Sequence, residues 1–155
     1  MQRSRQWIVW LVTGAKLGYL PIAPGTWGTL LGMGLIAPVM SYPVAHGIVT
    51  LLALFCSIWW VDLYLSMSDS VSEDPKEVII DEIIGVWIAL FMLPTNIFSF
   101  LVAFGVFRFF DIVKPFPVSY FDRKIKGSLG VVLDDVCAGL LSNILLQLGH
   151  HFLWD

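Results

Sequence analysis

The chain has 155 residues, enough for a single domain, and a net charge of −3. Its residues are 57% hydrophobic and 14% charged, whereas soluble domains are about 45–50% apolar and about 25% charged. Together with a mean hydropathy of +0.81, this composition excludes a disordered chain and argues against a water-soluble globule. The acidic balance gives no support to a nucleic-acid-binding surface. We expect one membrane-embedded domain over residues 1–155, all-helical because no strand alternation is visible.

The N-terminal segment begins with basic residues and continues into a short apolar run, Trp7 to Val12. A secretory signal peptide needs about 7–15 apolar residues and a small-residue cleavage site, so this run does not fit one. Tryptophan is enriched at the headgroup depth of a bilayer, which suits Trp7 and Trp10. The segment therefore predicts an interfacial helix. Cys56 and Cys137 lie inside apolar runs and support neither a disulfide framework nor a zinc site.

Four apolar stretches follow along the chain: Trp27 to Met40, Val44 to Leu65, Ile83 to Phe107, and Val136 to Trp154. The second and the fourth are long enough to span a bilayer core, which takes about 20 residues. The first is short and stops at Pro38. The third carries Pro94-Thr95-Asn96 near its middle, so it is either one kinked span or a hairpin of two shorter helices.

The basic residues favour the hairpin. If the first two stretches form one hairpin and the halves around Pro94 form another, the N-terminus, loop 66–80 and loop 111–133 share one side of the membrane. All lysines and arginines then lie on that side, which the positive-inside rule makes cytoplasmic. A single third span would put Lys76 opposite the others. The nine basic residues are Arg3, Arg5, Lys16, Lys76, Arg108, Lys114, Arg123, Lys124 and Lys126.

Two acidic pairs, Asp81-Glu82 and Asp134-Asp135, mark the starts of the third and fourth apolar stretches. Acids in a first helical turn are ordinary, because they complement the helix dipole. However, each pair is followed by a glycine, Gly85 or Gly139, and small residues let helices approach closely. If the two helix starts meet, four carboxylates converge and repel one another unless a cation lies between them. Oxygen ligands without histidine or cysteine suit Mg²⁺, which also binds substrate phosphate.

Two further features suit an anionic ligand. The loop between the acidic pairs is basic; its charges either attract anionic lipid or recognise a phosphate, with Lys114 as a point charge and Arg123 as a bidentate donor. The segment Pro24-Gly25-Thr26 precedes an apolar helix, where Thr26 suits an N-cap and the helix N-terminus suits an anion. Such a segment is also an ordinary helix start.

Four sequence blocks occur in a fixed order: GYLPIAPGTWGTL at 18–30, DPKEVIIDEIIG at 74–85, FRFFDIVKPFPVSYFDR at 107–123, and GSLGVVLDDVCAG at 127–139. Together they resemble the phosphatidylglycerophosphatase A family of bacterial membrane lipid phosphatases, over most of residues 14 to 150. The resemblance implies Mg²⁺-dependent removal of the terminal phosphate from phosphatidylglycerophosphate. The product would be phosphatidylglycerol, formed at the bacterial inner membrane with the active site on the cytoplasmic side.

The family's acidic blocks imply catalytic residues and metal ligands in this chain. They fall on Asp81, Glu82, Asp134 and Asp135, which we expect to hold one or two Mg²⁺ ions. There are two departures from the family pattern. Glu73 stands where many members have a histidine before the residue that matches Asp74, so no role for a histidine there is inherited. Ser128 replaces a usual glycine, which weakens any backbone contact to phosphate at that point.

The family's Phe-Asp-x-x-Lys-Pro block falls on two further candidate catalytic residues, Asp111 and Lys114. We expect Lys114 to stabilise phosphate charge, and Asp111 to orient the lysine, assist a metal or act as a base. The candidate substrate-binding residues are Gly25, Thr26, Arg108 and Arg123.

Two other classes of protein stay open. A lipid-alcohol phosphotransferase also sets acids around a metal, although its Asp-Gly-x-x-Ala-Arg run is absent here. A small transporter or assembly subunit would use Asp62 as a proton-relay acid. A histidine nucleophile is not expected, because His46, His150 and His151 lie on the opposite side of the membrane in this topology, at the surface or at an interface.

Overall fold

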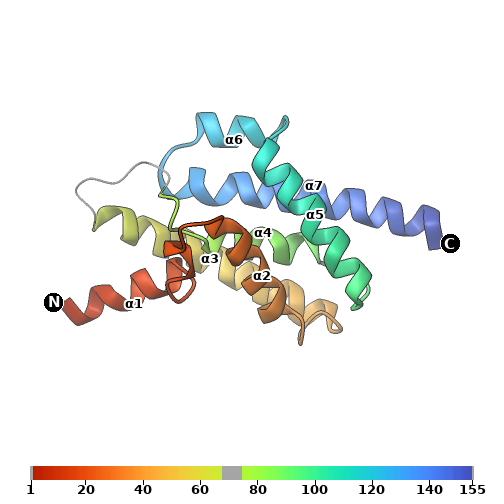
Figure 1. Cartoon of the computed structure of the whole chain (residues 1–155), viewed down its shortest axis with the longest axis horizontal. Coiled ribbons are helices and arrows are strands. Elements are labelled where there is room, and N and C mark those ends of the chain that lie inside the picture. Colours follow the sequence, from red (N-terminus) through yellow and green to blue (C-terminus); the bar gives the residue numbers. More distant parts are fainter. Residues whose placement is uncertain (1, 68–74, 155) are drawn as a thin grey trace.

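The structure is a computed structural model that describes residues 2–67 and 75–154, with side chains over 6–67 and 75–152. These residues form seven α-helices and a short 3-10 helix, η1, without any strand (Figure 1). The all-helical prediction is therefore confirmed for the described part of the chain. The elements are α1 (Gln2–Val12), η1 (Leu17–Tyr19), α2 (Pro24–Ile36), α3 (Pro43–Ser66), α4 (Ile80–Ala89), α5 (Ile97–Val113), α6 (Val118–Lys124) and α7 (Gly127–Trp154).

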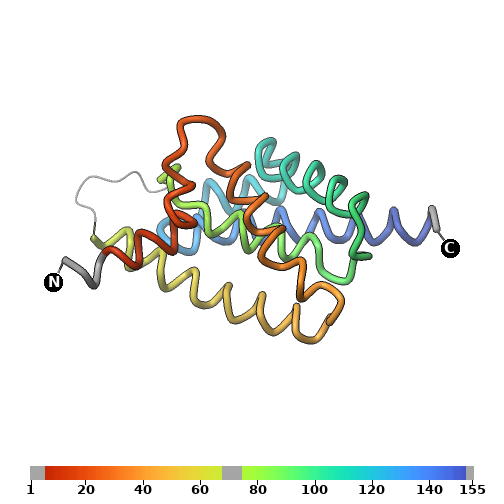
Figure 2. Tube along the Cα trace, turned by 60° about the horizontal axis from the view of Figure 1, so that its bottom comes forward, coloured from red at the N-terminus to blue at the C-terminus, as the bar shows by residue number. Residues whose placement is uncertain are grey.

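Helix α4 lies at the centre of the bundle. It packs against α7, α2, α3 and α5, and the trace in Figure 2 shows it enclosed between its longer neighbours. Its apolar residues Ile84, Val86 and Ala89 are almost completely buried. Because α4 is short and apolar on most of its surface, it is stable only inside this shell of helices.

Within the described part of the chain, two helices are long and apolar enough to cross a membrane: Pro43–Ser66 and Gly127–Phe152. The outer face of α3 exposes large apolar side chains, among them Leu51, Leu52 and Phe55, each more than half exposed. Such a face suits hydrocarbon rather than water. The chain is therefore a membrane-associated helical bundle, as its composition predicts.

The third apolar stretch is two helices joined by a turn, which confirms the hairpin. Asn96 caps α5, because its side-chain oxygen accepts a hydrogen bond from the backbone N–H of Ser99 at 2.9 Å. Asn143 and Gln147 of α7 donate to the carbonyl oxygen of Phe91 at 2.7 and 3.0 Å. These two amides supply hydrogen-bond donors to a backbone carbonyl just beyond the end of α4, in an apolar setting that offers no water. They also attach the far end of α4 to α7.

The fourth apolar stretch begins earlier than predicted. Helix α7 starts at Gly127, so the predicted start near Val136 is wrong, and Asp134-Asp135 lies inside the helix rather than in its first turn. The physical reason is tertiary packing: Val131 and Val132 are buried in an apolar cluster with Val12 and Val61. Burial of those side chains stabilises the helix over residues 127–135, a segment whose hydrophobic pattern is weak.

Three smaller predictions are corrected or confirmed. Loop 111–133 is not all loop, since α5 continues to Val113 and α6 follows. Helix α1 forms as predicted, with Ile8 buried against the bundle and Trp7 and Trp10 exposed. His46 is not at a surface: it is fully buried, and its Nε2 donates to the carbonyl oxygen of Trp87 at 2.9 Å.

Candidate active site

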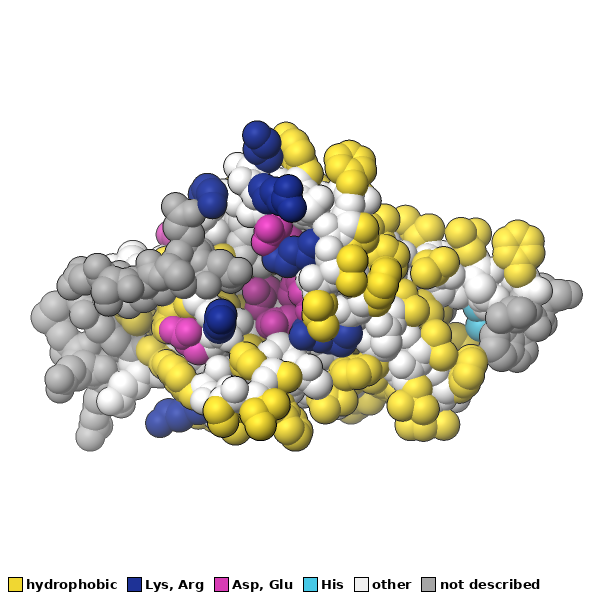
Figure 3. All heavy atoms as spheres, turned by 45° about the horizontal axis from the view of Figure 1, so that its top comes forward, with side chains coloured by type: hydrophobic (Ala, Val, Ile, Leu, Met, Phe, Trp, Pro, Cys, Tyr) yellow, Lys and Arg dark blue, Asp and Glu magenta, His cyan; other side chains and the backbone are white. Residues whose placement is uncertain are grey.

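A polar pocket of about 270 Å³ opens at one end of the bundle, where the first turns of α2 and α4 meet the end of α5 and the flank of α7. In Figure 3 it is a hollow with acidic side chains on its floor and lysine and arginine side chains around its rim. The turn between α2 and α3 and the turn between α4 and α5 lie away from it (Figures 1 and 2). Its charged lining residues are Lys76, Asp81, Glu82, Arg108, Asp111, Lys114, Asp134 and Asp135.

Glycines allow α4 and α7 to cross at close range beneath this pocket. A Cβ on Gly139 would lie 2.4 Å from the carbonyl oxygen of Gly85, and a Cβ on Gly85 would lie 2.6 Å from the ring of Phe107. No side chain larger than hydrogen fits at either position. The predicted close approach at these two glycines is confirmed, and it places the acidic pair of α4 opposite Asp135.

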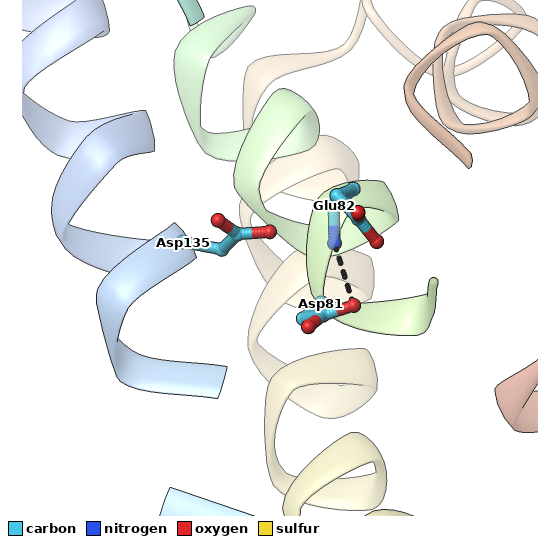
Figure 4. Close-up of side chains that lie close together, drawn as sticks. All are labelled: Asp81, Glu82 and Asp135. Atoms are coloured by element: carbon cyan, nitrogen blue, oxygen red, sulfur yellow. Dashed lines mark hydrogen bonds between the residues drawn. The ribbon is translucent and has the colours of Figure 1, made fainter. Parts of the chain in front are cut away.

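Three carboxylates converge at the floor of the pocket. One oxygen each from Asp81, Glu82 and Asp135 lies within 4.8 Å of the others, and Figure 4 shows the side chains grouped between α4 and α7. Asp81 and Asp135 are buried, and the Oε2 atom of Glu82 is buried without a hydrogen-bond partner. Buried carboxylates this close to one another repel unless a bound cation or a proton neutralises part of their charge. An all-oxygen donor set with an orphaned oxygen fits a hard divalent cation.

Asp134, the fourth predicted carboxylate, has a different partner. Its Oδ2 accepts a hydrogen bond from Nζ of Lys114 at 2.6 Å, and the same Nζ donates to Asp122 of α6. Burial alone would lower the pKa of Lys114, but the hydrogen bonds to Asp122 and Asp134 raise it above its ordinary value. The lysine is therefore a fixed positive charge at the edge of the pocket.

Arg108 supplies the second positive charge. Its Nη1 lies 2.5 Å from Oδ2 of Asp111 and 4.0 Å from Oε1 of Glu82, and it donates to Thr29 at 3.5 Å. Asp111 thus contacts the arginine and not Lys114, and it lies within α5 rather than beyond its end. The Nε atom of Arg108 is buried and has no hydrogen-bond partner among the described residues, so one N–H of the guanidinium is unsatisfied.

The segment at the start of α2 meets this pocket through its glycine. A Cβ on Gly25 would lie 2.2 Å from Oε1 of Glu82 and 2.9 Å from Nη1 of Arg108. Thr26 is not the N-cap, which is Ala23, because Pro24 occupies the first helical position. Pro24 and Gly25 line the pocket. Thr26 is not among the lining residues, so only Gly25 of the two candidate substrate-binding residues in this segment lies at the pocket.

Some predicted residues lie elsewhere, and some contacts were not predicted. Arg123 is exposed in the last turn of α6 and does not line the pocket. Glu73 and Asp74 fall outside the described residues. The contacts of Thr29 and Asp122 were missed, since each depends on the placement of a neighbouring helix. Asp122 does lie within the third of the four sequence blocks, at 107–123, but that block alone did not indicate its partner.

The fold and this pocket define a membrane-associated helical protein with an acidic, metal-compatible site lined also by three basic side chains, Lys76, Arg108 and Lys114. The family model of phosphatidylglycerophosphatase A matches residues 10–150. The chain is 33% identical to phosphatidylglycerophosphatase A of Escherichia coli K12, over 98% of this chain and 88% of that protein. The chain therefore belongs to the phosphatidylglycerophosphatase A family, which confirms the resemblance seen in the four blocks and places the chain among the lipid phosphatases.

Other relatives agree on a lipid phosphatase. The chain is 35% identical to phosphatidylglycerophosphatase A of Haemophilus influenzae, over 88% of this chain and 84% of that protein. It is 36% identical to a Bacteroides thetaiotaomicron protein named provisionally as a phosphatidylinositol-3-phosphatase, over 94% and 95% of the two chains. No solved structure matches this chain. These relatives favour the phosphatase over the phosphotransferase and the transporter. Asp62, the acid of the transporter alternative, accepts a hydrogen bond from Ser128 at 3.3 Å and does not line the pocket.

Proposed function

We propose that this protein hydrolyses the terminal phosphate monoester of phosphatidylglycerophosphate, giving phosphatidylglycerol and inorganic phosphate. The observation that carries the proposal is the convergence of three carboxylates, two of them buried, with Arg108 and Lys114 in one pocket at the end of an apolar bundle. Family membership supplies the class of substrate. A phosphomonoester on a lipid headgroup reaches such a pocket while its acyl chains stay in the bilayer.

The proposed cofactor is Mg²⁺, held by Asp81, Glu82 and Asp135. The donor set contains only carboxylate oxygens, and one of them, Oε2 of Glu82, lacks any other partner. When bound, such an ion supplies positive charge to the phosphate and helps to ionise the attacking water. Asp134 contributes less directly, because its Oδ2 is engaged by Lys114.

Arg108 and Lys114 are proposed to bind the phosphate from two sides. Phosphoryl transfer places charge on the equatorial oxygens, so fixed donors aimed at those oxygens lower the barrier. Asp111 holds the guanidinium through the 2.5 Å contact with Nη1, while Nε is left for the ligand. Asp134 and Asp122 hold the ammonium in the same way.

The proposed location is the cytoplasmic membrane of a bacterium, with the pocket on the cytoplasmic side. Lys76, Arg108 and Lys114 all line the pocket, and the turns 37–42 and 90–96 carry no lysine or arginine. That asymmetry is the one the positive-inside rule describes. Cysteine substitutions at Lys76 and at Tyr42, probed with a membrane-impermeant thiol reagent in intact cells, should label position 42 and spare position 76.

The function is tested with purified protein in lipid–detergent micelles. We expect release of inorganic phosphate from phosphatidylglycerophosphate when Mg²⁺ is present and none after chelation. Asp135→Asn should lower kcat by at least about 100-fold, the scale expected when charge stabilisation of the transition state is lost. Asp62→Asn is the matched control, since Asp62 lies outside the pocket, and it should retain full activity.

Two results would contradict the proposal. Wild-type protein that releases no phosphate from this lipid would remove the substrate assignment, and full activity in Asp135→Asn would remove the site. Phosphatidylinositol 3-phosphate, assayed in parallel, tests the activity that the Bacteroides relative is named for. Faster turnover of that lipid would reassign the headgroup while leaving the chemistry of the pocket unchanged.

A further inference from the structure

Asp122 contacts a residue of the pocket without lining the pocket itself. Its Oδ1 accepts a hydrogen bond from Nζ of Lys114, whereas the lining set includes Lys114 and Asp134 but not Asp122. Asp122 is carried by α6, a short helix that packs against α7 and is anchored by the fully buried Val118. The position of this carboxylate is therefore fixed by the bundle.

The backbone directs Lys114 toward Asp122. Lys114 ends α5 in the left-handed conformation, with φ of 47°, and its backbone N–H bonds to the carbonyl oxygen of Phe110. This geometry turns the side chain off the α5 axis and toward α6 and α7. An ammonium has three donor hydrogens. Asp122 and Asp134 take two of them, which leaves one for a ligand in the pocket.

We propose that Asp122 is a positioning residue that holds the Lys114 ammonium at the rim of the pocket, where it meets the substrate phosphate. The proposal rests on the proposed function, since it deepens the role of the same site. Asp134 adjoins the buried carboxylates, so with Asp134 as its sole partner the ammonium is drawn inward onto the acidic floor. The side chain of Asp122 is the more exposed of the two, 35% against 9% for Asp134, so Asp122 lies on the outer side and balances that attraction.

The enzymatic test compares Asp122→Leu with Asp122→Asn. Leucine is close in shape to aspartate but accepts no hydrogen bond, whereas asparagine keeps Oδ1 as an acceptor. We expect Asp122→Leu to raise KM for the lipid phosphate about tenfold, as for the loss of one charge-assisted hydrogen bond. The Mg²⁺ concentration for half-maximal activity should not change, and Asp122→Asn should recover most of the loss. Lys124→Ala, on the same helix, is the control and should behave as wild type.

A double-mutant comparison separates positioning from a structural role. If Asp122 acts through Lys114, then Asp122→Leu has no further effect in a Lys114→Ala background. An equal loss in both backgrounds overturns the proposal, as does wild-type KM in Asp122→Leu or a parallel rise in the Mg²⁺ requirement. In each of these cases wild-type protein still hydrolyses the lipid, so the proposed function survives.

A second measurement does not need turnover. Acylation of lysines by an amine-reactive reagent, read by mass spectrometry, should modify Lys114 several-fold more slowly than the exposed Lys124, because two carboxylates hold its Nζ. Asp122→Leu should speed the modification of Lys114 and leave that of Lys124 unchanged. An unaltered rate at Lys114 overturns the proposal even if no variant is active.

Discussion

Gly139 of α7 faces the carbonyl oxygen of Gly85 in α4, so closely that a methyl group on Gly139 would stand 2.4 Å from that oxygen. The contact joins the two helices that carry the converging carboxylates, one turn below Glu82 and Asp135. Helix separation at this crossing therefore sets the distance across the acidic floor. Substitution of the glycine tests that dependence directly.

Gly139→Ala should separate α4 from α7 and lower both stability and activity. Forcing a methyl group against backbone costs about 1–3 kcal/mol in a packed core, which thermal unfolding in detergent measures as a lower Tm. Gly149→Ala is the control on the same helix, because nothing lies within 4 Å of its added Cβ. Equal unfolding temperatures for the two variants would show that the crossing does not limit stability.

Gly25→Ala should impair activity with little effect on stability. Its added Cβ meets Oε1 of Glu82 at 2.2 Å and Nη1 of Arg108 at 2.9 Å, and both atoms belong to flexible side chains that can move aside. The displacement disturbs a proposed metal ligand and a proposed phosphate donor together, so we expect at least about a tenfold loss in kcat/KM. Gly34→Ala, in the same helix and in open space, should match wild type in both measurements.

Asparagine substitutions should separate the metal ligands from the partner of the lysine. Asp81→Asn should raise the Mg²⁺ concentration required for activity about tenfold or more, because one anionic ligand becomes neutral. Asp134→Asn should leave that concentration near the wild-type value and raise KM for the lipid, since Asp134 engages Lys114 at 2.6 Å. Mg²⁺ titrations at saturating lipid, followed by lipid titrations at saturating Mg²⁺, check both. A shared rise in Mg²⁺ requirement would make Asp134 a ligand after all.

Arg108→Lys should be poorly active although the charge is retained. Lysine cannot reproduce the planar set of donors that contacts Asp111 and Thr29 while leaving Nε for a ligand. We expect a loss of about 10–100-fold in kcat/KM, because a hydrogen bond to a charged group contributes about 1.5–3 kcal/mol. Activity within twofold of wild type would show that only a point charge is needed. The conservative exchange Lys124→Arg, at an exposed site, controls for expression and insertion.

Much of the fold was predictable because it depends on local signals. The apolar run at 44–65 has the length of a membrane span, and Pro94-Thr95-Asn96 interrupts the run at 83–107 where α4 gives way to the turn. The start of α7 was not predictable, since Val131 and Val132 stabilise the helix through an apolar cluster with α1, α3 and the start of α4. The same holds for α6, whose anchor Val118 is buried by other helices.

The candidate site, like the fold, was predictable only in those parts that depend on local sequence signals. Two acidic pairs, each followed by a glycine, predicted that α4 and α7 meet, and the structure brings Asp81, Glu82 and Asp135 together. The pairing of Lys114 with Asp122 was not predictable, because it requires the left-handed end of α5 and the placement of α6. Burial of His46 escaped prediction for a similar reason: its partner is the backbone carbonyl of Trp87 in another helix.

Helix α4 carries the carboxylates at one end, and its other end continues into the turn that Asn143 and Gln147 hold through the Phe91 carbonyl. Ten helical residues make a stiff rod of about 15 Å, too short to bend appreciably between those ends. The two amides fix this rod along its axis together with the hydrogen bonds that join Trp87 of α4 to His46 and Gly32, so the carboxylates at its start are held in place from its far end as well. Two neutral side chains on the opposite side of the bundle therefore contribute to the depth at which this protein presents its acids to a lipid headgroup.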